Sequence, residues 1–477
     1  MTSSPIEESA PRRHVSVAYV VMVAVAMVVG AGIFRSPADI AANAGSATWF
    51  FGAWLAGGLI SLMGALCFAE LATMLPSAGG DYHFLKTTYG RGVAFLFAWA
   101  RFAIINTGSL ALLGFVLGDY ANAVWPLGPN GSSWYALITI VAMTLFNLKG
   151  LYTGQSADYA MTGLEVGGLL IVFAAGVALA ISGAPPLSPE ATPSPGIPGT
   201  FGLALLFVLF AFSGWSEVST LSAEVRDGRR GMVRALIAAV LTITVLYLLA
   251  NWALWRGLGL AGLAASRTPA SDVIAHAFGD WAGVLTALAI AMATLTSINA
   301  TIVVGARTTY AAAADWPRLA SLGHWNTVRG IPVAGIVSQG IMGLVLVGFG
   351  TYARDGFVTM VDYSSPVFWL FLSLSGFAVI LLRWRRPDLP RPFRVPLYPW
   401  LPLLFVASCL FVLWSSLAYV KLGALAGVAM LGVGGVALWW VRRSHTRSPI
   451  PRVAPTRAEG ISVTSKATPS ISSPPPG

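Results

Sequence analysis

The sequence predicts an all-α integral membrane protein, and three observations carry that prediction. Of the 477 residues, 56% are hydrophobic and only 10% are charged, with a mean hydropathy of +0.73. A soluble domain with so few charges could not cover its own surface. The apolar residues gather in blocks near the roughly 20 residues that a spanning helix needs. The basic residues fall in alternate connections between these blocks.

The apolar blocks predict about twelve transmembrane helices. The eighth is longer than a bilayer requires, so we expect it to tilt or to extend beyond the membrane. The first is longer than a signal-peptide core, so we expect it to remain as a spanning helix. The blocks cover residues 17–42, 47–75, 94–118, 133–149, 157–182, 201–223, 233–255, 280–313, 331–350, 356–382, 397–420 and 422–441.

The net charge of +10 is explained by where the basic residues lie. Every second connection is rich in Lys and Arg, whereas segments 119–133 and 183–200 contain neither. The positive-inside rule then places both termini in the cytoplasm of a multi-pass cell-membrane protein. We expect no nucleic-acid partner, because no soluble domain is present to carry a basic patch.

The predicted organisation is one transmembrane domain with two polar tails. Cys67 and Cys409 both lie in apolar blocks, so the loops have no disulfide framework. Segment 183–200 holds six prolines and separates two sets of five helices with a similar layout. The units are a cytoplasmic tail 1–16, a transporter domain 17–443 with repeats 17–182 and 201–383 and extra helices 397–441, and a disordered cytoplasmic tail 444–477.

Each set of five opens with an apolar helix that glycine interrupts near its middle. Matching breaks in two halves indicate a transporter's midplane binding site. An unwound backbone in lipid needs partners for its NH and CO groups, and a zwitterion supplies both. The alternative is that these glycines only let helices pack closely. The predicted substrate-binding residues are Gly30, Ala31, Gly32, Ile33, Phe212, Ser213, Gly214 and Trp215.

An ordered set of motifs resembles the APC (amino acid–polyamine–organocation) superfamily, nearest to bacterial L-type amino acid permeases. The resemblance covers most of 15–420 and implies a LeuT-type fold of two inverted five-helix repeats. It further implies alternating access and a substrate site between discontinuous helices 1 and 6. The motifs are Gly30-Ala31-Gly32-Ile33-Phe34, Ala69-Glu70-Leu71, Pro76 to Tyr82, Phe212-Ser213-Gly214-Trp215, Ala223 to Asp227, and Pro387 to Pro396.

The sequence departs from the family's pattern in several places. The family often has Asp or Gly where Ser213 stands, and Pro where Gly228 stands. Eukaryotic L-type members bond covalently to a partner through a cysteine after helix 3. Segment 119–133 has no cysteine, so we expect no disulfide-linked partner subunit.

Charges inside the predicted helices are few and are treated as functional candidates. Glu165 stands where many relatives have lysine, and desolvation would favour its protonated form, which suits a proton carrier. Arg101 lies at a similar depth, about 14 Å from the same side, and a structural pair with Glu165 is the alternative. The resemblance places Ser297 of the eighth block close to the position facing helix 5. Oxygen atoms of that block could coordinate sodium, with interhelical hydrogen bonding as the alternative; its other polar residues are Thr294, Thr296, Asn299 and Thr301. We rank sodium below proton coupling because an arginine nearby would oppose a bound cation.

The remaining charges divide into one cavity candidate and several bracing candidates. Glu217 follows the second break, where it either contacts a cationic substrate or braces the inner half-helix. Trp215 follows the same break directly and could cover the substrate. Asp362 lies near an outer helix end, where we expect it to be solvated. Glu70, Asp81, Glu224 and Arg226 are expected to brace gates or loops near the cytoplasmic face.

The function predicted is secondary active transport of amino acids, neutral L-amino acids first, by proton symport or exchange. Transport of cationic amino acids or polyamines is the alternative, and a non-transporting nutrient sensor ranks lower because the tails are too short for a signalling domain. An enzyme is not expected, since the five histidines are scattered and no hydrolase, metalloprotease or ATP-binding motif is present. No cofactor or metal is expected; the partners are an amino acid, protons and the lipid bilayer.

Overall fold

The structure, a computed structural model, describes most of the chain between residues 16 and 445. The predicted tails 1–16 and 444–477 lie almost wholly outside the described residues, as do Glu224, Arg226 and the centre of segment 183–200. The described residues are 16–77, 79–150, 155–188, 200–223, 225, 228–314, 316–319, 321, 323–326, 331–353, 355–419 and 422–445.

The described chain is almost entirely helical, which confirms the predicted fold class. It contains 11 helices that are long and apolar enough to cross a membrane, beside the shorter apolar helix α1. No β-strand forms among the described residues, apart from one isolated bridge between Asn326 and Ile331. The long helices are α3 (Ala47–Met74), α7 (Gly131–Leu148), α8 (Gln155–Ile181), α10 (Gly228–Ala265), α12 (Asp280–Ala314), α13 (Val333–Thr351), α14 (Gly356–Arg385), α15 (Trp400–Tyr419) and α16 (Leu422–His445). Of these, α10 is kinked at Gly259, where φ is +71°.

Two helices are interrupted at the predicted glycines. The first runs as α1 (Val17–Val28), a short 3₁₀ turn η1 (Ala31–Phe34) and α2 (Ser36–Ala44). The other runs as α9 (Phe201–Ala211) and a 3₁₀ segment η3 (Trp215–Ala223). A 3₁₀ segment of nine residues is unusually long, and such stretches often mark strain or a hinge.

The third spanning helix has an irregular turn that the hydrophobic pattern did not indicate. It begins as α5 (Arg91–Ala100), passes through one π-helical turn η2 (Arg101–Ile105) and continues as α6 (Asn106–Val124). Two short helices were also not predicted, α4 (Gly80–Tyr89) and α11 (Pro269–Phe278). Both are only ten residues long, so neither forms an apolar block of spanning length.

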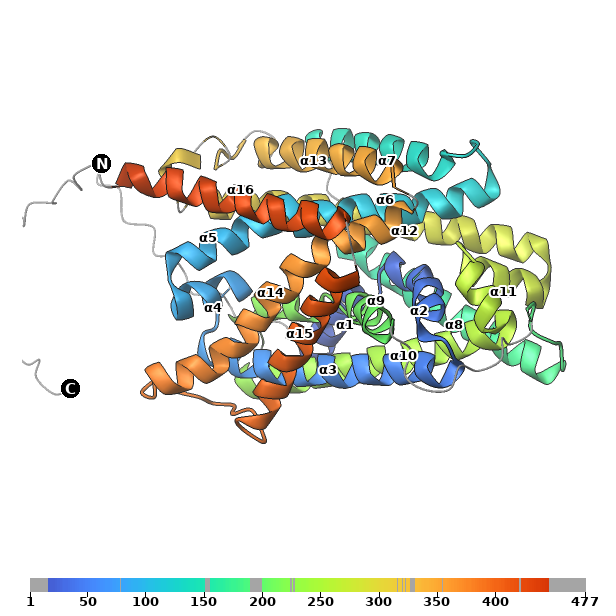
Figure 1. The fold of residues 1–477 in the computed structure, drawn as a ribbon, viewed down its shortest axis with the longest axis horizontal. Coiled ribbons are helices and arrows are strands. Elements are labelled where there is room, and N and C mark those ends of the chain that lie inside the picture. Colours follow the sequence, from blue (N-terminus) through green and yellow to red (C-terminus); the bar gives the residue numbers. More distant parts are fainter. Residues whose placement is uncertain are drawn as a thin grey trace, which may run out of the picture.

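The long helices lie side by side along one bundle, with α4 at one end and α11 at the other (Figure 1). We call these the α4 end and the α11 end. α16 lies against α5 and α14, and α15 packs against α14, α9 and α3. The interrupted helices lie inside the bundle, since α1 packs on α10 and η3, and α9 packs on α2 and α3. The breaks are thereby surrounded by protein, where an irregular backbone is tolerated in a membrane.

Candidate functional site

The two helix breaks meet at one buried tyrosine. The Tyr247 hydroxyl on α10 lies 2.9 Å from the carbonyl oxygen of Val28 and 3.0 Å from that of Ala211. Each carbonyl closes the helix just before its break, and Tyr247 is fully buried. Gly214 adopts φ +115°, and a Cβ on it would lie 2.5 Å from the Met27 carbonyl oxygen. The second break therefore rests directly on the end of α1, and only glycine fits there.

The first break leaves open space beside its glycines. A Cβ placed on Gly30 or Gly32 would meet no atom within 4 Å. The Ile33 and Arg35 amides close turns onto the Gly30 and Gly32 carbonyls, at 3.3 Å and 3.1 Å. The helix that follows, α2, begins at Ser36 and directs its amino terminus at this loop. Such a terminus favours a negatively charged group, so the loop suits a carboxylate.

The predicted residues of the second break have different environments. Phe212 is buried, with its ring 5.1 Å from that of Tyr247. Ser213 lines a small void together with Trp215. The Trp215 indole packs edge-on against Phe68 of α3, with ring centroids 5.1 Å apart. In this conformation Trp215 is held among α3 and α15, so covering a substrate would require it to move.

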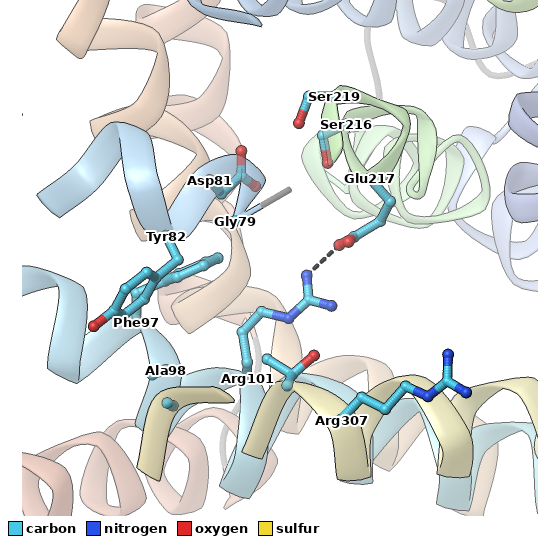
Figure 2. Close-up of a pocket in the computed structure, with 12 residues that line it drawn as sticks. Gly79, Asp81, Tyr82, Phe97, Ala98, Arg101, Ser216, Glu217, Ser219 and Arg307 are labelled. Atoms are coloured by element: carbon cyan, nitrogen blue, oxygen red, sulfur yellow. Dashed lines mark hydrogen bonds and ion pairs between the residues drawn. The ribbon is translucent and has the colours of Figure 1, made fainter. Parts of the chain in front are cut away.

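Toward the α4 end, a cavity of about 320 Å³ lies beside η3. Arg101 of η2 donates a hydrogen bond to the Glu217 carboxylate of η3, and Figure 2 shows the two side chains pointing at each other. Arg307 of α12 and Asp81 of α4 complete the charged lining. The remaining lining residues are Gly79, Tyr82, Phe97, Ala98, Ser216, Ser219, Thr308 and Ala312.

The alternative pairing of Arg101 with Glu165 is wrong in this structure. Arg101 pairs with Glu217, while Glu165 of α8 accepts a hydrogen bond from Ser297 of α12 at 3.1 Å. The two residues share a depth but face different neighbours, because α8 packs on α10, α11 and α12. Among the ion pairs of the described residues, none includes Glu165, although its side chain is buried.

The hydroxyls of α12 that were weighed as sodium ligands bond mostly to their own helix. Thr294 donates to the Ile290 carbonyl at 2.7 Å, and Thr301 donates to the Ser297 carbonyl at 2.8 Å. The Asn299 side chain accepts from an asparagine of α7 instead. The two threonine bonds therefore stay within α12, and the Asn299 bond joins α12 to α7.

The α11 end is closed by a charge cluster that the sequence did not reveal. Arg35 at the start of α2 is only 4% exposed, yet it reaches carboxylates from three elements. It lies 2.8 Å from Asp39 of α2, 2.8 Å from Asp355 at the start of α14 and 3.5 Å from Asp119 of α6. Arg267, 62% exposed, stands 4.0 Å from Asp119. This cluster joins α2, α6 and the start of α14.

A signal for Arg35 was present in the sequence, since it directly follows the Gly30 to Phe34 motif inside an apolar block. An arginine inside an apolar block is expensive unless it is paired, and Asp39 stands four residues further along the same block. Asp362, in contrast, was expected to be solvated and is only partly exposed, because Gly423 of α16 packs against it.

Glu70 holds the α4 end together as a brace. It is completely buried and accepts two hydrogen bonds from Arg383 of α14, at 2.8 Å and 2.5 Å. It also accepts one from the Val395 amide at 2.7 Å. This carboxylate of α3 therefore fixes the connection between α14 and α15.

An α-helical bundle with two interrupted helices in contact, open space at one break and charge clusters on either side is typical of a membrane transporter. The sequence model of the amino acid permease family matches residues 15–439. The chain belongs to that family, within the APC superfamily, and is a multi-pass membrane transporter and not an enzyme.

Curated relatives agree with this assignment. The chain is 26% identical over 425 residues to the b(0,+)-type amino acid transporter 1 of Mus musculus, covering 87% of this chain and 85% of the relative. It is 26% identical over 430 residues to the large neutral amino acids transporter small subunit 2 of Homo sapiens, covering 87% and 78%. It is 24% identical over 445 residues to the serine/threonine exchanger SteT of Bacillus subtilis, covering 93% and 99%.

Proposed function

We propose that this protein moves neutral L-amino acids across the cell membrane by alternating access, as a proton symporter or an exchanger. The observation that carries the proposal is the contact between the two helix breaks beside open space at Gly30 and Gly32. The amides at the start of α2 suit a substrate carboxylate, and carbonyls freed by unwinding suit its ammonium. The names of the relatives, which include neutral and serine/threonine carriers, support the same substrate class.

The alternative substrate class, cationic amino acids or polyamines, depends on Glu217. Its carboxylate is already bonded to Arg101. A substrate amine would have to displace the Arg101 guanidinium, whose side chain on η2 is only 11% exposed. This existing pair favours a neutral substrate. Because one relative is a b(0,+)-type transporter, cationic amino acids are included in the uptake test as the alternative substrates.

Glu165 is our proposed proton carrier. It is buried on α8 beside α12, where it accepts a hydrogen bond from the Ser297 hydroxyl and forms no ion pair among the described residues. An unpaired buried carboxylate costs several kcal/mol, roughly, and proton uptake removes that cost. Rehydration of this site during alternating access would let the proton leave.

Orientation and assembly follow from charge and cysteine placement. α5 begins at Arg91, and α14 ends at Arg385, close to the α4 end of the bundle (Figure 1). We therefore place the α4 end, with both termini, in the cytoplasm. Since Cys67 and Cys409 are both buried, we propose that the transporter works without a disulfide-linked subunit.

The test is uptake of radiolabelled amino acids and polyamines into proteoliposomes, with and without an inward proton gradient. We expect neutral amino acids to accumulate or to exchange. In the symport case, Glu165→Gln keeps exchange but loses accumulation driven by the gradient. Ser297→Ala is the matched control, because it removes the hydrogen bond to Glu165 and leaves the carboxyl in place.

Three results separate the alternatives. Uptake that ignores the gradient and needs internal substrate identifies an exchanger and removes Glu165 as a proton carrier. Preferred uptake of cationic compounds replaces the neutral substrate class. If nothing moves while the purified protein remains folded, the transport proposal fails and the sensor alternative replaces it.

A further inference from the structure

The cavity near the α4 end is lined by residues of both charges. Asp81 and Glu217 contribute carboxylates, whereas Arg101 and Arg307 contribute guanidinium groups. Formally the four charges cancel. Arg101, Glu217 and Arg307 lie on helices of spanning length, where ionisable groups are expensive to hold, so their presence around one cavity indicates a ligand site or an ion pathway.

Two of these side chains have polar atoms without a hydrogen-bond partner. The Asp81 Oδ1 atom and the Arg101 Nε atom are both buried and make no hydrogen bond to the described residues. The first accepts and the second donates. Because buried polar atoms in native proteins are almost always satisfied, these two require a partner such as a ligand or water.

The helix that carries Arg101 is locally distorted at this residue. The single π-helical turn Arg101–Ile105 begins there, and the Tyr363 hydroxyl bonds the Ala103 carbonyl within it at 2.8 Å. A π turn inserts an extra residue, which turns the preceding side chains relative to those that follow. Such turns recur at functional sites. Here the π turn begins at Arg101, the residue that pairs with Glu217 of η3.

We propose that this cavity is a second binding site for the transported amino acid, in which Arg101 receives the carboxylate while Asp81 and Glu217 receive the ammonium. The inference rests on the proposed function, because it takes the cargo to be a zwitterion. The cavity of about 320 Å³ is of the size that holds a small ligand. Arginine suits the carboxylate, since its planar fork can donate to both oxygens.

Binding here would also act on the helix arrangement. Arg101 and Glu217 now join helix 3 to η3 across the cavity. A zwitterion bound between them would replace the Arg101–Glu217 ion pair by two ion pairs, one from each residue to the ligand. The direct link between η2 and η3 would then be broken. The site thus couples occupancy near the α4 end to movement of the second broken helix.

The experiment measures equilibrium binding of L-[³H]serine, and of L-[³H]leucine as a second probe, to purified protein in lipid nanodiscs. Wild type is expected to bind two molecules per chain. The double variant Arg101→Met/Glu217→Gln is expected to bind one, and it leaves no unpaired member of the pair behind. Asp81→Asn is expected to weaken the second site about tenfold, as loss of one charged hydrogen bond does.

The matched control is Gly32→Leu, which fills the open space at the first break. It is expected to remove the other molecule and leave the cavity site occupied. Ethanolamine and N-acetyl-L-serine each offer only one of the two charges, so neither is expected to displace the probe that Gly32→Leu retains.

Three outcomes overturn the inference. One molecule per chain in wild type, lost in Gly32→Leu and kept in the double variant, overturns it while leaving the proposed function intact. Displacement by ethanolamine alone shows an amine site instead of an amino acid site. No binding of any amino acid to folded wild type overturns the inference and the proposed function together.

Discussion

Replacement of Arg35 by methionine should open the α11 end of the transporter. Arg35 holds Asp39, Asp119 and Asp355 together, and methionine keeps much of its packing volume while removing its charge. The three carboxylates would then repel one another inside the closed bundle. Separation of α2, α6 and α14 relieves that repulsion by letting water in, and proton uptake by the carboxylates is the competing route.

The size of the effect follows from burial. Side-chain exposure is 4% for Arg35, 7% for Asp119, 16% for Asp39 and 27% for Asp355, so solvent screens the cluster weakly. Removing one member of a buried pair costs about 3–5 kcal/mol. If the closed state alone loses about 3 kcal/mol, the open population rises roughly 100-fold, since 1.4 kcal/mol is a factor of ten.

The assay is labelling of a cysteine placed at Ala38, which is 1% exposed on α2. The native Cys67 and Cys409 are buried, so a membrane-impermeant maleimide has little background. The labelling rate is expected to rise by about two orders of magnitude with Arg35→Met.

Arg267→Met is the matched control, because this arginine is 62% exposed and its pair contributes at most about 1 kcal/mol. Its labelling rate should change less than roughly fivefold. An unchanged rate in Arg35→Met, with the protein folded, would refute the view that this cluster holds the gate closed.

Three further predictions concern the breaks and the cavity. Gly214→Ala should abolish folding or transport, because its Cβ would lie 2.5 Å from a carbonyl oxygen of α1; a melting curve and an uptake assay check this. Tyr247→Phe leaves two buried carbonyls without their hydroxyl partner, and a cost of about 1–3 kcal/mol should appear as a lower melting temperature. Burial, then the Glu217 charge, raises the pKa of Asp81 to about 8, although Arg101 opposes this. Asp81 therefore ionises as the pH rises from 7 to 9, and binding of an ammonium group in the cavity should strengthen in wild type but not in Asp81→Asn.

The positions of the helix breaks could be predicted from the sequence because glycine inside an apolar helix lowers the stability of that helix locally. Gly30 and Gly32 interrupt one block, and Gly214 interrupts the other, where the structure shows non-helical backbone. The fold class was equally predictable, since hydropathy and helix length depend on nearby residues only.

The partner of Arg101 could not be predicted because depth along a helix does not fix direction around it. The sequence predicts a similar depth for Arg101 and Glu165, yet Arg101 pairs with Glu217 and Glu165 bonds to Ser297 of α12. The Arg35 cluster could not be predicted for a related reason. Its carboxylates Asp119 and Asp355 lie 84 and 320 residues away along the chain, and no local pattern connects them.

The charges of this transporter are arranged so that one end is closed while the other retains a cavity. At the α11 end Arg35 is bound by three carboxylates, whereas at the α4 end the Arg101–Glu217 pair stands beside open volume. Between the two ends, Tyr247 binds the last carbonyls of both α1 and α9. Because the two carbonyls share one hydroxyl proton, movement of either helix half changes the hydrogen bond that the other half can accept. This shared hydroxyl gives the two breaks a direct route by which to change state together.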